Sequence, residues 1–64
     1  MEVHPPGGVL HDIEGVRQRL LLKDKRAVYR LIESGQLPHY RVANKIRVSD
    51  EQIARFLAER EVVA

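Results

Sequence analysis

The 64-residue sequence predicts a mostly helical α+β fold: three short helices, with a two-stranded β-hairpin between the second and the third. Apolar residues recur at three- and four-residue steps in three separate stretches, as in helices that each bury one face. Alternation with period two replaces this spacing only between residues 39 and 48, where we expect the hairpin. The length fits one domain, and so small a domain leaves little room for an enclosed substrate cavity.

The composition excludes several classes of protein. There is no cysteine, so disulfides, thiolate metal sites and thiol catalysis are excluded. The longest apolar run, residues 20–22, is far too short to span a membrane. Residues 1–6 lack the basic and apolar regions of a signal peptide, so we expect a cytoplasmic protein with no membrane partner.

The first element is an extended or flexible arm over residues 1–8, because prolines and glycines at 5–8 disfavour a helix. The first helix is predicted over residues 13–20, with Asp12 as its N-cap. Gly15 lies inside this helix at a cost of up to about 1 kcal/mol, and we interpret it as room for a close helix crossing. The face expected to be buried carries Leu10, Ile13, Val16 and Leu20.

The second helix is predicted over residues 25–34, with Asp24 as its N-cap and Gly35 as a left-handed stop. Two short helices joined by a few residues indicate a helix-turn-helix. The apolar stripe contains Ala27, Val28, Leu31 and Ile32, which leaves Lys25, Arg26, Tyr29, Arg30 and Glu33 facing outward.

The hairpin is expected to pair residues 39–42 with residues 46–48 around a tip at 43–45, where Asn44 tolerates a positive φ. A hairpin in this place is called a wing. In this interpretation Arg41 and Arg47 point away from the inner face. That face is shared by Tyr40, Val42, Ile46 and Val48.

The third helix begins after Ser49, which forms a capping box with Gln52, and runs to about Arg60. Residues 61–64 are expected to be a frayed tail, so the winged domain spans residues 9–60. One shared core is predicted, made of Leu10, Ile13, Val16, Leu20, Val28, Leu31, Ile32, Leu37, Val42, Ile46, Val48, Ile53, Phe56 and Leu57.

The charges are segregated along the chain. Residues 17–47 carry a net charge of +7, between ends that carry −3 (residues 1–16) and −2 (residues 48–64). A basic middle indicates one positive face and a polyanionic partner, although a solvated surface with chance clustering would show the same composition.

The second helix and its exit carry the segment KRAVYRLIESGQLP, residues 25–38. This segment, with the hairpin and third helix that follow, resembles the excisionase group, whose DNA-binding domain is a MerR-like winged helix-turn-helix. The resemblance implies a recombination directionality factor of a bacterium or phage. Such a factor has no catalytic centre, binds double-stranded DNA as several adjacent copies, bends it, and directs a separate integrase toward excision.

Two features depart from the group's usual pattern. The turn between the first two helices, residues 21–23, has no glycine and is one residue longer. The wing tip is poorer in glycine and arginine, so minor-groove contact should be weaker or depend on Lys45 alone.

The resemblance also assigns DNA-binding residues. The second helix enters the major groove with Lys25, Arg26 and Arg30, since arginine can donate two hydrogen bonds to guanine. Tyr29 either donates its hydroxyl to a phosphate or packs under the wing. The wing contacts phosphates or a narrow minor groove through Arg41, Lys45 and Arg47. Lys23 reaches the backbone, and weaker candidates are Arg17 and Arg19. A solvated face is the alternative for all of these cations.

No catalytic or metal site is expected, and no cofactor. His4, His11 and His39 share no metal-ligand spacing, and Ser34 and Ser49 have structural roles at helix ends. Two other functions stay open at this point: a small MerR-like transcriptional regulator that occupies promoter DNA, and a protein-interaction module whose basic face meets an acidic protein.

Overall fold

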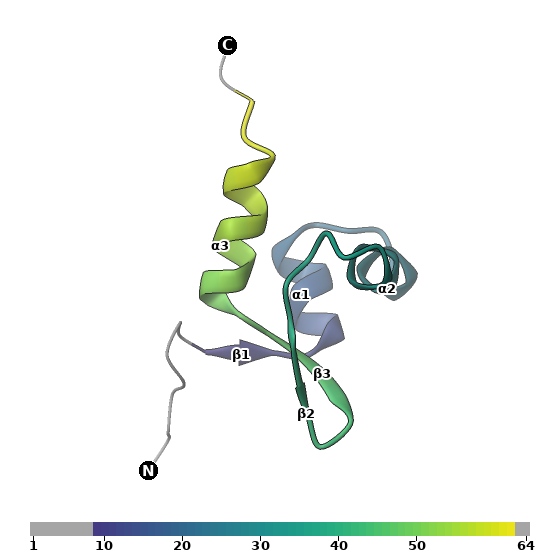
Figure 1. The fold of residues 1–64 in the computed structure, drawn as a ribbon. Helices are drawn as coiled ribbons and strands as arrows, with labels where there is room; N and C mark the ends of the chain where they lie inside the picture. The colour runs from purple at the N-terminus through teal and green to yellow at the C-terminus, as the bar shows by residue number, and fades with distance from the viewer. Residues whose placement is uncertain (1–8, 63–64) are drawn as a thin grey trace.

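The computed structural model describes residues 9–62 (Figure 1). The predicted arm at 1–8 and the last two residues of the predicted tail lie outside this range. In chain order, the elements are β1 (Leu10–His11), α1 (Ile13–Arg19), α2 (Lys25–Glu33), β2 (Tyr40–Val42), β3 (Lys45–Ser49) and α3 (Asp50–Glu59).

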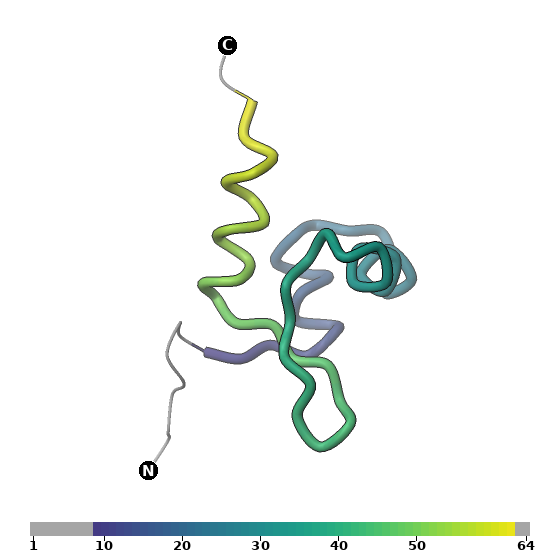
Figure 2. The backbone as a smooth tube through the Cα atoms, viewed as in Figure 1, coloured from purple at the N-terminus to yellow at the C-terminus, as the bar shows by residue number. Residues whose placement is uncertain are grey.

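Helices α1 and α2 pack together as the helix-turn-helix, and the hairpin β2–β3 projects from them as the wing (Figures 1 and 2). Helix α3 starts directly after β3 and extends away from the wing (Figure 1). The predicted fold of three helices with a hairpin between the second and third is thus confirmed.

Side chains cap the start of every helix, as the sequence predicted. Asp12 accepts a hydrogen bond from the Gly15 amide at 2.8 Å, and Asp24 accepts one from the Ala27 amide at 3.1 Å. Ser49 and Gln52 exchange hydrogen bonds of 3.1 and 3.0 Å in a complete capping box. Because these caps are local, the predicted helix bounds agree with the structure to about one residue.

Helices α1 and α2 end in the same hydrogen-bond pattern with different residues. After α2, Gly35 takes a φ of 77°, and the amides of Gly35 and Gln36 bond back to the last turn. After α1, the equivalent residue is Leu21, with a φ of 56° and a side chain that is 90% exposed. A leucine there is strained in the left-handed region, where glycine is not.

The sheet has a third strand that the sequence interpretation missed. β1 pairs antiparallel with β3 in the order β1-β3-β2, so Leu10 lies in a strand and not on the first helix. Asp50 at the start of α3 holds β1: its carboxylate accepts from His11 Nε2 at 2.5 Å, and its amide donates to the Val9 carbonyl at 3.2 Å. Gly15 makes room for this strand, since a Cβ there would lie 3.2 Å from the His11 Cβ.

The predicted register of the wing is wrong by one residue. Only Ala43 and Asn44 form the tip, both with positive φ, so Val42 pairs with Lys45 and Tyr40 with Arg47. Directly paired residues share a face, so Tyr40 and Val42 lie with these two cations, and Arg41 lies with Ile46. A shift of one residue exchanges the faces of a strand, which explains why Val42 is half exposed.

The core confirms eleven of the fourteen predicted residues, seven of them buried and four partly buried, and adds one. Leu57 is half exposed, because α3 turns Gln52, Ile53 and Phe56 inward instead, and Leu22 packs against the core although it was not predicted. Buried core residues are Val16, Val28, Ile32, Leu37, Val48, Ile53 and Phe56; Ile13, Leu20, Leu31 and Ile46 are partly buried.

Replacing Leu21 by glycine should stabilise the fold by about 1 kcal/mol, because the left-handed conformation then costs no side-chain strain. Thermal unfolding should show a Tm raised by several degrees for a domain of this size. The matched control is Leu21→Ala, which removes the exposed side chain but keeps the strain, and should gain little. An equal rise in Tm in both variants would show that the exposed leucine side chain, and not backbone strain, destabilises the wild type.

Candidate nucleic-acid interface

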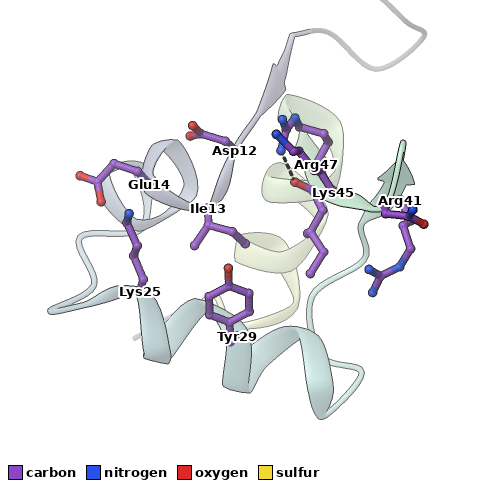
Figure 3. Close-up of a pocket in the computed structure, with 10 residues that line it drawn as sticks. Asp12, Ile13, Glu14, Lys25, Tyr29, Arg41, Lys45 and Arg47 are labelled. Atoms are coloured by element: carbon purple, nitrogen blue, oxygen red, sulfur yellow. Dashed lines mark hydrogen bonds between the residues drawn. The ribbon is translucent and has the colours of Figure 1, made fainter.

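An open groove of about 480 Å³ separates α2 from the wing (Figure 3). One end is formed by the N-terminal end of α1, with Asp12, Ile13 and Glu14. The rest is lined from α2 and from the wing, by Lys25, Tyr29, Arg41, Asn44, Lys45, Ile46 and Arg47.

Five of the eight predicted DNA-binding residues meet in this groove. Two come from α2 and three from the wing, so residues 12 to 22 positions apart in the sequence contribute to one surface (Figure 3). The five are Lys25, Tyr29, Arg41, Lys45 and Arg47; the groove lining does not include Lys23, Arg26 or Arg30.

Helix α2 presents a second surface beside the groove. Arg26 and Arg30 are four residues apart and thus share a face, turned about 100° from the face of Lys25 and Tyr29. Both arginines are exposed, Arg26 by 82% of its side chain. Arg26 lies 3.5 Å from the Asp24 carboxylate, whereas no carboxylate in residues 9–62 lies within 4 Å of Arg30. Arg30 is therefore the less neutralised of the two.

The hydroxyl of Tyr29 points into the groove beside Ile13 (Figure 3). The ring is 43% exposed, and the hydroxyl makes no hydrogen bond within residues 9–62. Since a phenol hydroxyl can donate, this group is available to an acceptor that enters the groove.

The three wing cations differ in how exposed their side chains are and in whether they already make a hydrogen bond. Lys45, directly after the tip, is exposed. Arg41 is exposed and faces the groove because of the corrected register, which the sequence interpretation did not anticipate. Arg47 is half-buried, and its guanidinium donates to the carbonyl of Ile46 at 2.8 Å (Figure 3). Lys45 and Arg41 are thus better placed than Arg47 to bind an anion.

Comparison with known proteins agrees with this arrangement. A family model described as a helix-turn-helix domain matches residues 18–61, more than half of the chain. The chain belongs to this helix-turn-helix family. The family binds DNA, so double-stranded DNA is the partner of this domain. No curated protein and no solved structure matches the chain.

The groove between α2 and the wing is acidic at the end formed by α1. Glu14 accepts two hydrogen bonds from Arg17, at 2.7 and 2.6 Å, and one from Gln18 at 2.9 Å. These hydrogen bonds lower the pKa of Glu14 from 4.5 to about 2, and the charges of Arg17 and Lys25 act in the same direction. Arg17 is thus occupied by Glu14 and Arg19 lies 4.0 Å from Asp50, which fits their place as weaker DNA-binding candidates.

The described part of the domain contains no cluster of three metal-ligating side chains and no helix that is both long and apolar enough to cross a bilayer.

Acid should weaken the fold through Glu14. A carboxyl whose pKa is lowered on folding contributes stability that is present above about pH 4.5 and is lost as the pH falls toward 2. In Glu14→Gln, unfolding followed from pH 5 to pH 2 should therefore depend less on pH than in the wild type. As a control, Glu33→Gln removes an exposed carboxylate that is within 4 Å of no cation in residues 9–62, and should keep the wild-type profile.

Proposed function

We propose that α2 enters the major groove of DNA while the wing reaches the adjacent minor groove. Neighbouring grooves of a duplex are separated by one sugar–phosphate backbone. The groove between α2 and the wing would then hold that backbone. The observation that carries this proposal is the meeting of Lys25, Tyr29, Arg41 and Lys45 around one open groove.

The roles of the side chains follow from their positions. Arg26 and Arg30 lie on the exposed face of α2 and would donate to base edges, where the planar guanidinium matches guanine. The groove residues would take phosphates: Tyr29 through its free hydroxyl, Arg41 and Lys45 as charges, and Arg47 after release from Ile46. Lys23 precedes the N-cap of α2 and would contact the backbone there. Lys25 extends toward Glu14 (Figure 3) and would contact the DNA from there.

In the cell, we propose, the protein acts as an excisionase-type factor that bends DNA and directs an integrase toward excision. The similarity of residues 25–38 to that group supports this role. Smooth bending of a short site costs on the order of 1–6 kcal/mol. One small domain makes few contacts to offset that cost, so adjacent copies and a partner integrase would share it.

The location and shape of the bound DNA test this role. Fragments of the source genome captured by the protein should map to an attachment region of an integrative element, with several adjacent footprints. Circularly permuted fragments should migrate as bent DNA, and adding the protein to paired attachment sites with their integrase should raise excision. Footprints over promoters with no effect on excision would instead identify a transcriptional regulator.

Arg26→Ala should cost about 1–3 kcal/mol of binding to the cognate site, because a bidentate base contact is lost. Titration of a labelled duplex measures this. Arg26→Lys keeps the charge but not the fork of donors, so it should recover little of the loss. Arg55→Ala, which removes an exposed cation of α3 outside the groove lining, is the matched control. An unchanged Kd in Arg26→Ala would remove this residue from the interface.

Lys45→Ala should weaken binding to cognate and random duplexes by similar factors, because a phosphate contact carries no sequence information. The slope of log K against log salt should become shallower by about one unit. Titrations at several salt concentrations measure both quantities. A loss confined to the cognate sequence would contradict the phosphate role.

A further inference from the structure

The tip of the wing is a two-residue turn built from residues other than glycine. Ala43 has a φ of 50° and Asn44 a φ of 65°, the combination that glycine and asparagine usually supply in hairpins. Asparagine accepts this conformation readily, while alanine is strained in it. Backbone strain of this kind often accompanies a functional site.

The side chain of Asn44 is not used by the turn. It is exposed, lines the groove, and makes no hydrogen bond within residues 9–62. A side-chain amide has two hydrogen-bond donors and an acceptor. At the tip of the wing, Asn44 therefore has these groups available to a ligand. The tolerance of asparagine for a positive φ explains the backbone here but leaves an exposed amide without a structural role at the tip, the part of the wing that would reach furthest into the adjacent minor groove.

Asn44 also differs in chemistry from its neighbours. The other polar side chains that the wing contributes to the groove are the cations Arg41, Lys45 and Arg47. Cations are attracted to phosphates whatever the sequence, whereas a neutral amide lacks this charge attraction and can pair with base edges through its donors and its acceptor. Within the described wing, Asn44 is therefore the uncharged polar residue of the groove lining and a candidate to read a base.

We propose that Asn44 determines the sequence preference of the wing, by donating its amide hydrogens to the minor-groove edge of an A·T pair. This rests on the proposed position of the wing in the minor groove. There, A·T pairs present only the acceptors adenine N3 and thymine O2, while guanine adds an amino group that an amide donor cannot face. The adjacent Lys45 favours the same sequences, because A·T-rich minor grooves are narrow and more negative.

Base analogues separate the two grooves in the test. The full chain first selects its site from a random duplex library, and the A·T pairs flanking that site are then replaced one at a time. Inosine·cytosine keeps the minor-groove edge of A·T and changes the major-groove edge. Diaminopurine·thymine keeps the major-groove edge and adds the minor-groove amino group. At the wing position, the wild type should tolerate inosine·cytosine and lose about fivefold in affinity with diaminopurine.

The variant Asn44→Gly removes the amide and keeps the left-handed backbone, so the wing should fold, and an unchanged or higher Tm checks this. It should bind the A·T and diaminopurine duplexes equally. Arg26→Ala should bind both more weakly but keep the fivefold difference between them.

Three results would overturn the proposal. One is a wild type that discriminates against diaminopurine at no flanking pair, and another is an Asn44→Gly protein that discriminates as the wild type does. With either result the proposed docking of α2 would stand as long as Arg26→Ala still weakens binding. The third, a failure to select any duplex, would overturn the docking as well.

Discussion

The fold depends on the pairing of the central strand β3. It holds the wing strand β2 along one edge and β1 along the other, and its Val48 is fully buried in the core. The next residue, Ser49, ends the strand and caps α3, so the direction of the strand determines where that helix starts. Loss of β3 would detach the wing, the first strand and the last helix from the helix-turn-helix at once.

The geometry of the site follows from this strand and from the end of α2. Gly35 turns the chain back after α2, Leu37 anchors the exit in the core, and the hairpin then rises beside the helix. The wing is therefore fixed at both of its ends, and the distance between α2 and the wing cations is set by buried residues. In the proposed docking, a groove held in this way by buried residues would receive a backbone with little rearrangement of the protein, which lowers the ordering cost of binding.

Most of the helical part of the fold was predictable from the sequence, because its signals are local. The N-cap residues Asp12, Asp24 and Ser49 predict where the helices start, and Gly35 predicts where α2 ends. The strand β1 was missed because it is two residues long and Leu10 happens to continue the helical spacing of α1. The wing register was wrong because a tip without glycine gives no signal for a two-residue turn.

The site was predictable in its residue types but not in its grouping. Charge and spacing selected the cations, yet nothing local shows that Arg41 faces α2, since this depends on how β2 pairs with β3. Nor does spacing show that Arg17 is occupied by Glu14, or that Asn44 lines the groove. These facts belong to tertiary structure, where one residue of register exchanges two faces.

The two ends of the groove are not equivalent. Asp12 and Glu14 line one end, where Arg17 and Lys25 partly balance their charge, and the wing cations line the other, so a polyanion is attracted more strongly at the second end. A nucleic-acid strand laid across this surface consequently has one favoured direction of approach. A single bound domain of this kind therefore has a direction along the DNA, and it has no internal two-fold axis. The relative orientation of two adjacent copies would therefore be recorded in their sites, as direct repeats or as inverted halves.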